Sequence, residues 1–210
     1  MKTIKELGDF NFKYNLNIRE IFGIKRSVLF WKYVDYIASK MDKIAKAYEN
    51  TVGKEYRKEI DNFNLKDDKK ILHIGCGAYP ITALILAEMN NTEIITIDSN
   101  HRSIKLANKV IHKKKLEDKI KVEYGDATNY PLNGFDTIII SGCSVPKIQV
   151  FSYIIKNAKP NSKIIIRDSF LNIESILSNI APNQNVKIAK KIKNHAFTNS
   201  NWTSYCLLKK

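Results

Sequence analysis

Short apolar runs alternate with amphipathic segments through the middle of the chain. Residues 71–74 form the first, largely apolar run, which is typical of a strand buried in a parallel sheet. Gly75 and Gly77 follow at once, where the chain must turn sharply and a ligand can approach its backbone. Residues 80–89 then have the apolar spacing of a helix, and residues 93–97 form a second apolar run. The pattern predicts a strand, a glycine turn, a helix and a second strand.

The same alternation continues to the end of the sequence. Further strands are predicted over residues 119–124, 135–141, 163–167, 186–196 and 202–208, and further helices over residues 99–116, 146–158 and 173–180. Only a polar turn separates the last two strands, so we expect an antiparallel hairpin there. The chain is therefore predicted to be an α/β protein with a Rossmann-like, doubly wound fold. Its sheet should be seven-stranded and mostly parallel, with a C-terminal antiparallel hairpin.

The N-terminal third has a helical pattern instead, although residues 1–25 carry only weak periodicity. From Ser27, which is placed to cap a helix, apolar residues recur in steps of three and four. They are Phe30, Val34, Ile37, Met41, Ile44 and Tyr48. Gly53 is expected to end or bend this helix, and residues 55–63 have the pattern of another. We predict an N-terminal helical cap over residues 1–66 and a Rossmann-like domain over residues 67–210.

Composition limits the class of protein and its location. With 210 residues, 44% of them hydrophobic, the chain can bury the core of one domain. No apolar run reaches the roughly 18 to 20 residues of a membrane span, and the N-terminus lacks the apolar segment of a signal peptide. The three cysteines, Cys76, Cys143 and Cys206, are far apart, as are the four histidines, so no metal site is expected. Free thiols favour a cytoplasmic location.

The net charge of +14 raises the question of nucleic-acid binding. The excess is nearly all lysine and is spread along the chain, with its densest clusters at residues 112–115 and 187–193. There are few arginines to clamp phosphates or contact bases. A solvated, lysine-rich surface is therefore favoured, and an RNA-binding face is the alternative.

Three candidate binding features follow successive predicted strands. They are the Gly75–Gly77 turn, Asp98 and Asp126. Because the carboxyl ends of parallel strands border the ligand crevice of a doubly wound sheet, these features are expected to face one ligand. Each also has a simpler interpretation: glycine turns serve many folds, Asp98 can cap the helix that follows it, and Asp126 can stabilise a turn. Their regular placement favours the ligand-binding interpretation.

This layout resembles the class I S-adenosylmethionine-dependent methyltransferases over residues 68–210. The resemblance implies that the glycine loop passes the methionine part of the cofactor, that Asp98 binds the ribose hydroxyls, and that Asp126 and Ala127 border the adenine. A carboxylate can accept hydrogen bonds from both ribose hydroxyls, and with a neighbouring backbone amide it can bind the amino edge of adenine. The residues predicted to bind S-adenosylmethionine are His73, Gly75, Cys76, Gly77, Asp98, Ser99, Asp126, Ala127 and Ser141.

The loop departs from the usual methyltransferase pattern at one position. An acidic residue normally stands two residues before the first glycine, and His73 takes its place, so the usual contacts to the cofactor's amino-acid part are not expected. We expect His73 to be a half-buried strand residue rather than a base. Residues 75–82 (GCGAYPIT), residues 145–154 and Arg167 are similar to the archaeal nicotianamine synthases, which also lack that acid.

The second resemblance implies a different reaction. Nicotianamine synthases transfer the aminobutanoate group of the same cofactor and release methylthioadenosine, and a larger N-terminal helical domain supplies a catalytic glutamate and tyrosine. By position, Tyr56, together with Tyr48 or Glu55, is the candidate for that role in this chain. Plain core packing is the favoured role of both tyrosines.

Residues 141–146, after the fourth predicted strand, are expected to face the acceptor. They lack the Asn/Asp-Pro-Pro-Tyr/Phe motif of methyltransferases that act on planar amino groups. Cys143 lies here, but nothing near it in sequence activates a thiol, so a packed loop cysteine is favoured over a nucleophile.

We therefore predict an S-adenosylmethionine-dependent group transferase, with methyl transfer to a small molecule favoured. Aminobutanoyl transfer with release of methylthioadenosine is the alternative, and a non-enzymatic RNA-binding protein on the same fold is a further one. NAD binding is disfavoured because Pro80 stands where the third glycine of the dinucleotide-binding motif belongs.

Overall fold

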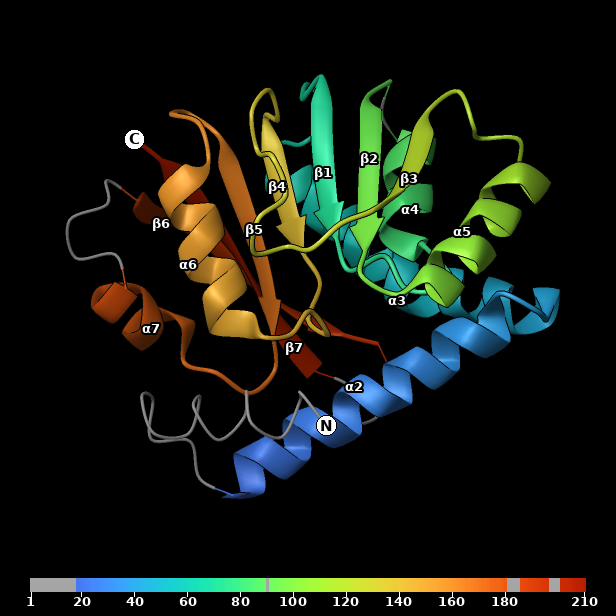
Figure 1. Ribbon diagram of the computed structural model, residues 1–210, viewed down its shortest axis with the longest axis horizontal. Helices are drawn as coiled ribbons and strands as arrows, with labels where there is room; N and C mark the ends of the chain where they lie inside the picture. Colours follow the sequence, from blue (N-terminus) through green and yellow to red (C-terminus); the bar gives the residue numbers. More distant parts are fainter. Residues whose placement is uncertain (1–17, 90, 181–185, 197–200) are drawn as a thin grey trace.

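The computed structural model of the protein describes residues 18–89, 91–180, 186–196 and 201–210 (Figure 1). The described strands form one seven-stranded sheet in the order β3-β2-β1-β4-β5-β7-β6. They are β1 (Lys70–Ile74), β2 (Glu93–Asp98), β3 (Ile120–Tyr124), β4 (Thr137–Ile140), β5 (Lys163–Asp168), β6 (Val186–His195) and β7 (Asn201–Lys209). The predicted α/β fold is confirmed, with strand bounds close to those expected from the sequence.

The strand order reverses at β1. This strand pairs in parallel with β2 on one side and with β4 on the other. Such a reversal separates the loops that follow the two neighbouring strands and leaves a crevice at their carboxyl ends. β7 pairs antiparallel with both β5 and β6, so the predicted terminal hairpin is also confirmed.

Helices cover both faces of the sheet (Figure 1). They are α3 (Asp42–Asn62), α4 (Ile81–Met89) and α5 (His101–Lys113) on one face, and α6 (Lys147–Asn157) and α7 (Ile173–Ile180) on the other. Because side chains alternate along a strand, β1 contributes to both cores: Leu72 and Ile74 pack on the side of α6, and Ile71 packs on the side of α4.

The N-terminal third forms two helices whose boundary differs from the prediction. α2 (Ile18–Ala38) precedes α3, and residues 39–41 separate them. The single helix expected from Ser27 through Tyr48 is therefore wrong, and Ser27 lies inside α2 instead of capping it. Residues 1–17, part of the weakly periodic stretch, lie outside the described residues.

The turn between α2 and α3 arises from local hydrogen bonding that apolar spacing does not reveal. The Ser39 hydroxyl donates to the carbonyl of Tyr36 over 2.7 Å, and Met41 has an extended backbone with φ −126° and ψ 109°. After this change of direction α3 buries Tyr48, whereas Met41 and Ile44 are exposed. The predicted apolar stripe therefore does not form one continuous face.

Gly53 lies inside α3, so the expectation that the helix ends at this residue is wrong. Residues 55–63, predicted as a separate helix, belong to the C-terminal half of α3 and its C-cap. A Cβ atom at residue 53 would lie 3.1 Å from Cδ1 of Ile85 in α4. Glycine therefore allows α3 and α4 to approach closely, which is a packing reason for a glycine within a helix.

α2 runs across the carboxyl ends of the strands (Figure 1). Ile24 is buried in the core on the side of α6, and Ala38 is buried in the core on the side of α4. α2 thus joins the two cores and covers the crevice beside β1. Within the described ranges, no helix combines the length and the apolar character needed to cross a membrane.

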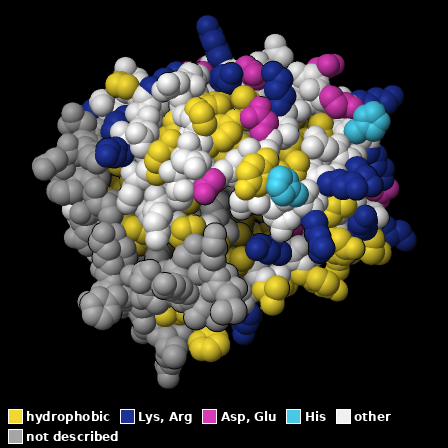
Figure 2. Space-filling view, viewed as in Figure 1, with side chains coloured by type: hydrophobic (Ala, Val, Ile, Leu, Met, Phe, Trp, Pro, Cys, Tyr) yellow, Lys and Arg dark blue, Asp and Glu magenta, His cyan; other side chains and the backbone are white. Residues whose placement is uncertain are grey.

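Positive charge is spread over the surface. Figure 2 shows Lys and Arg side chains across one face, densest towards the side that carries α5, with acidic and hydrophobic side chains between them. Some of these lysines are paired, as Lys113 is with Asp42 and Lys114 is with Glu49. This mixture is typical of a solvated surface, and RNA binding stays a prediction.

Candidate functional site

A cavity lies where α2 and α3 meet the carboxyl ends of the central strands. His73, Gly75, Cys76 and Ser141 line it, so four of the residues predicted to bind the cofactor come together here. Aromatic side chains from α2, α3, β7 and the loops after β1 and β5 complete much of the wall. They are Trp31, Tyr48, Tyr56, Tyr79, Phe170 and Trp202. The site is thus built from both the N-terminal helices and the α/β domain.

The glycine loop after β1 needs both of its glycines. Gly75 has φ +82° and Gly77 has φ +66°, a left-handed conformation that other L residues rarely adopt. A Cβ atom at Gly75 would lie 2.5 Å from Oγ of Ser144, and one at Gly77 would overlap the Asp35 carboxylate. The two glycines therefore let the side chains of Ser144 and Asp35 approach the loop backbone closely at the edge of the cavity.

Asp98 ends β2 beside this loop. Its Oδ2 atom accepts a hydrogen bond from the backbone N–H of Gly77 over 3.0 Å, and its Oδ1 atom accepts one from the N–H of Asn100 over 2.9 Å. The helix cap of α5 is Asn100, so capping by Asp98 is not its role. Ser99, also predicted to bind the cofactor, is exposed next to it. The Asp98 carboxylate keeps further acceptor capacity on both oxygens.

Asp126 and Ala127 follow β3 and do not line the cavity. Oδ1 of Asp126 accepts hydrogen bonds from the backbone N–H of Thr128 over 2.8 Å and from its hydroxyl over 2.7 Å. The turn role considered for Asp126 is therefore present. The N–H of Gly125 donates to the carbonyl of Asp98 over 3.2 Å, which places this turn next to the end of β2. Adenine binding at this turn stays a prediction.

His73 is a fully buried residue of β1, more buried than expected, and it is hydrogen-bonded on both ring nitrogens. Nδ1 lies 2.9 Å from Oγ1 of Thr96, and Nε2 lies 2.8 Å from Oγ of Ser141. Burial, with a smaller contribution from Arg167, lowers the pKa of His73 to about 3. The ring is therefore neutral and holds the Ser141 hydroxyl at the end of β4.

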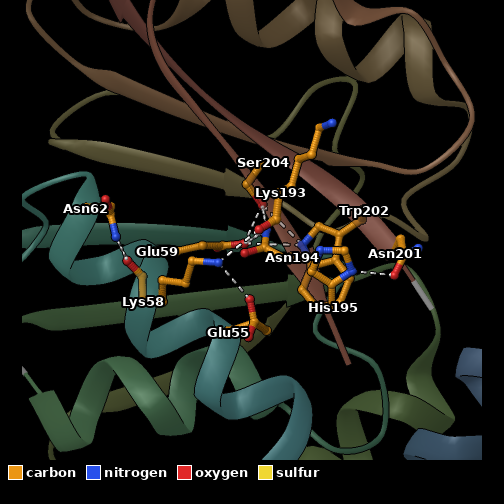
Figure 3. Close-up of polar contacts among 10 residues, drawn as sticks. All are labelled: Glu55, Lys58, Glu59, Asn62, Lys193, Asn194, His195, Asn201, Trp202 and Ser204. Atoms are coloured by element: carbon orange, nitrogen blue, oxygen red, sulfur yellow. Dashed lines mark hydrogen bonds and ion pairs between the residues drawn. The ribbon is translucent and has the colours of Figure 1, made fainter. Parts of the chain in front are cut away.

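A buried network joins α3 to β5 and to the terminal hairpin, and Figure 3 shows its contacts with the hairpin. Nε of Arg167 donates to Oε2 of Glu59 over 2.8 Å, and its Nη1 donates to Oγ1 of Thr82 over 2.7 Å. The other oxygen of Glu59 accepts from the Ser204 hydroxyl and from Nε1 of Trp202, the latter over 3.3 Å. Figure 3 shows the Glu59 side chain reaching from α3 towards these hairpin residues. The network fixes Arg167 in the cavity wall.

The catalytic candidates from the sequence are only partly at the cavity. Tyr56 packs against Arg167, with the guanidinium 3.6 Å from the ring centroid, and burial raises its pKa to about 12. Tyr48 lines the cavity and donates a hydrogen bond to Asp35. Glu55 is not part of the lining and pairs with Lys58 over 3.1 Å.

Sequence reasoning missed two acids of the site, Asp35 and Glu59. Asp35 lines the cavity from α2, and its Oδ1 atom is buried without a hydrogen-bond partner. Burial raises the pKa of Asp35 well above its usual value, a hydrogen bond from Tyr48 opposes that rise, and the charge of Asp98 adds to it. Glu59 lies three residues after Tyr56, a helical spacing that could have suggested a shared face.

The thiols at the site are not activated. Burial raises the pKa of Cys143 to about 12, with the charge of Asp35 adding to this effect, and burial also raises the pKa of Cys76. A thiol with such a pKa is almost entirely protonated near neutral pH, which agrees with the packing role expected for Cys143. In the described part of the chain, no group of three or more His, Cys, Asp or Glu residues is arranged to hold a metal ion.

The arrangement suits a nucleoside ligand with a polar tail. The glycine loop brings its backbone to the edge of the cavity, Asp98 offers carboxylate oxygens beside that loop, and aromatic side chains form much of the cavity wall. A family model described as a methyltransferase domain matches residues 65–206. A search of the curated proteins found no match.

Solved structures with a similar fold include MtNAS, a nicotianamine synthase. A mutant of MtNAS in complex with S-adenosylmethionine has a TM-score of 0.68 at 18% identity, over 90% of this chain and 76% of that chain. MtNAS in complex with MTA and tNA has a TM-score of 0.63 at 18% identity, over 85% of this chain and 69% of that chain. The mitomycin 7-O-methyltransferase MmcR has a TM-score of 0.58 at 12% identity, over 83% of this chain and 60% of that chain. At these identities the likeness establishes the fold.

Proposed function

The chain belongs to the methyltransferase-domain family, and from that premise we propose that it is an S-adenosylmethionine-dependent methyltransferase acting on a small-molecule acceptor. S-adenosylmethionine is the cofactor of this class, and the residues at the carboxyl ends of β1 and β2 fit it. The bare glycine backbone would pass the methionine part, and Asp98 would receive the ribose hydroxyls.

One contact carries the proposal: the hydrogen bond from the N–H of Gly77 to Oδ2 of Asp98, at 3.0 Å. It holds the glycine loop and the acid side by side at the point where the strand order reverses. A ligand that lies along the loop therefore meets a carboxylate with free acceptor capacity. This is the combination that binding of a nucleoside with a polar tail requires.

When bound, the cofactor supplies a sulfonium whose attached carbon is electrophilic. The chain's part is to hold an acceptor in line with that carbon and to keep water out. Trp31, Tyr48 and Phe170 are suited to the second task because they line the cavity beneath α2 and α3. No strong base is needed when the acceptor atom is already nucleophilic. The pKa of Tyr56, raised to about 12, and that of His73, lowered to about 3, are both far from neutral, so neither residue is poised as a general base.

The position of α2 supports a small acceptor. This helix crosses the carboxyl ends of the strands, and Ser27, Trp31 and Asp35 of α2 line the cavity. An acceptor must fit between this helix and the strand ends. A metabolite fits that geometry better than the side chain of a folded macromolecule.

Aminobutanoyl transfer with release of methylthioadenosine is the second candidate. The observation that favours it is the extent of the likeness to MtNAS, which covers up to 90% of this chain and so extends from the methyltransferase domain into the N-terminal helices. In this reaction Tyr56 or Tyr48 would lie beside the acceptor, because both line the cavity.

Product analysis separates the two reactions. The purified protein is incubated with S-adenosylmethionine and the low-mass filtrate of a cell extract, and the cofactor products are measured by mass spectrometry. S-adenosylhomocysteine supports methyl transfer, and methylthioadenosine above the level without protein supports the second candidate. If product forms with the high-mass fraction of the extract and not with the filtrate, the acceptor is a macromolecule and the proposal of a small-molecule acceptor is contradicted. No product, with no binding of S-adenosylmethionine in calorimetry, contradicts both reactions. Asp98→Asn is the matched control, because it is expected to reduce product formation in either reaction.

A further inference from the structure

Asp35 differs from the other charged residues of the cavity because one of its oxygens has no partner. Its Oδ1 atom is shielded from water and makes no hydrogen bond within the described residues. The carboxylate receives a hydrogen bond from Tyr48, which is a neutral group. A buried carboxylate oxygen without a partner is unfavourable, and such atoms nearly always have one.

The cation that lines the same cavity is already compensated. Arg167 contacts Glu59 through Nη2 and Oε2 at 2.7 Å, and both side chains are almost completely buried. His73 is neutral and hydrogen-bonded on both ring nitrogens. Asp35 is therefore the acid of the cavity lining, among the described residues, that has no cation beside it.

The position of Asp35 links this requirement to the glycine loop. Its Oδ2 atom occupies the space that a Cβ atom at Gly77 would need. Asp98 lies near enough for its charge to disfavour ionisation of Asp35, in addition to the larger effect of burial. Burial and the charge of Asp98 therefore favour the neutral form of Asp35 in the empty cavity, and a ligand that brings a cation there would favour the carboxylate and be bound by it.

β1, the strand before the glycine loop, carries no acid two residues before Gly75, where methyltransferases usually have one. His73 stands at that position, and its ring is hydrogen-bonded to Thr96 and Ser141. We propose that Asp35 of α2 binds the positively charged ammonium group of the methionine part of S-adenosylmethionine. α2 is then a cofactor-binding element as well as a cover. The inference rests on the proposed function, because it requires this cofactor in the cavity.

Calorimetry with three ligands tests the assignment. S-adenosylmethionine and S-adenosylhomocysteine both carry the ammonium group, whereas methylthioadenosine keeps the nucleoside and lacks it. In Asp35→Asn we expect the affinity for the first two to fall roughly 10- to 100-fold, the range of a hydrogen bond to a charged group. The affinity for methylthioadenosine should stay within about twofold of the wild type, since the variant does not touch the nucleoside site.

Two controls separate this effect from misfolding and from general electrostatics. Asp42→Asn removes the same charge from an exposed position at the start of α3 and should leave all three affinities unchanged. The melting temperature of ligand-free Asp35→Asn should be close to that of the wild type, because burial already favours the neutral form of Asp35 and the amide has the same shape.

The alternative source of the ammonium group is an amine acceptor. It is tested by titrating 1,3-diaminopropane into wild type and Asp35→Asn, each saturated with S-adenosylhomocysteine. The assignment to the cofactor would be overturned if the wild type binds this diamine and Asp35→Asn does not, while both bind S-adenosylmethionine with the same affinity. An equal loss for all three nucleoside ligands would also overturn it. If the wild type binds none of the three ligands, the proposed function itself fails, which is a distinct result.

Discussion

Glu59 and Arg167 form a buried ion pair although 108 residues separate them along the chain, with Nε of Arg167 2.8 Å from Oε2 of Glu59. The pair joins α3 to β5 at the cavity wall. The Ser204 hydroxyl of β7 donates to the other oxygen of Glu59. Three segments that are distant in sequence therefore depend on one carboxylate.

Glu59→Gln is expected to be strongly destabilising. The variant leaves the Arg167 guanidinium buried without its counter-charge, for which a loss of about 3 to 5 kcal/mol in the free energy of unfolding is typical. Urea unfolding measures this loss. Glu88→Gln is the matched control, because it removes a glutamate from the partly exposed pair with Arg57 and should change stability by less than about 1 kcal/mol. The double variant Glu59→Gln/Arg167→Met should be more stable than Glu59→Gln alone; the opposite order would contradict the role of the charge pair.

Gly77→Ala is expected to affect both stability and cofactor binding. An alanine at φ +66° is strained, and its Cβ atom would overlap the Asp35 carboxylate. Gly134→Ala separates these effects, because Gly134 has φ +88° and open space around its Cβ position. The free energy of unfolding should fall by about 1 to 2 kcal/mol in Gly134→Ala, from backbone strain alone. It should fall further in Gly77→Ala. Urea unfolding gives the stabilities, and calorimetry should show weaker S-adenosylmethionine binding in Gly77→Ala only. Equal behaviour of the two variants would show that the contact with Asp35 is unimportant.

The burial of His73 predicts a specific pH dependence of stability. Its pKa is lowered to about 3 in the folded protein, whereas an unfolded histidine titrates near about 6.5. Between these values the unfolded chain binds the additional proton. The contribution of His73 is therefore fully present above about pH 6.5 and is lost as the pH falls, by at most about 1.4 kcal/mol per pH unit. Urea unfolding from pH 7 to pH 5 should show a steeper decline for the wild type than for His73→Gln. Parallel declines would mean that the ring is not held neutral.

Asp98→Asn should weaken S-adenosylmethionine binding by about tenfold or more in calorimetry. In the proposed role of Asp98, the substitution removes the negative charge of the group that would accept hydrogen bonds from the ribose hydroxyls, while the amide oxygen can keep one of the backbone hydrogen bonds. Wild-type affinity in this variant would contradict the ribose-binding role of Asp98.

Asp98→Asn also tests whether the protein is an RNA-binding protein and not an S-adenosylmethionine-dependent enzyme. That function predicts affinity for a poly-uridine RNA that falls steeply with salt and is unchanged in Asp98→Asn. A protein that binds this RNA in that manner and does not bind S-adenosylmethionine would be an RNA-binding protein on a methyltransferase fold.

Cys143 is expected to be a slow nucleophile although it lines the cavity. A pKa raised to about 12 reduces its thiolate at pH 8 by roughly three orders of magnitude relative to a free thiol. Alkylation by iodoacetamide, followed by peptide mass spectrometry, should label Cys143 slowly in the folded protein and rapidly after denaturation. Rapid labelling of the folded protein would require a different environment for this thiol.

Local sequence signals predicted the parts of the site that depend on one strand and the turn after it. The Gly75–Gly77 loop and Asp98 lie at the carboxyl ends of β1 and β2 as expected, because apolar runs, glycines and an acid at a strand end have the same meaning in many α/β folds. Their binding of the cofactor stays a prediction. The hairpin was predicted because too few residues separate its strands for a helix.

The acids of the helices could not be placed in the same way. Asp35 and Glu59 are polar residues on amphipathic helices, where most acids are solvated, and only the packing of α2 and α3 on the α/β domain buries them. Glu55, the acid chosen by position, lies one turn away from Glu59. The turn at residues 39–41 contains no glycine or proline, so apolar spacing alone continued the helix through it.

The place of β7 in the sheet has a consequence for how the protein is made. β7 lies between β5 and β6, although it follows both in the chain. Until β7 has been synthesised, the edge of β5 that it covers has no partner, and Trp202 and Ser204 cannot yet contact Glu59. The cavity wall is therefore completed only after β7 has been synthesised, and until then this edge of β5 is open to pairing with another strand.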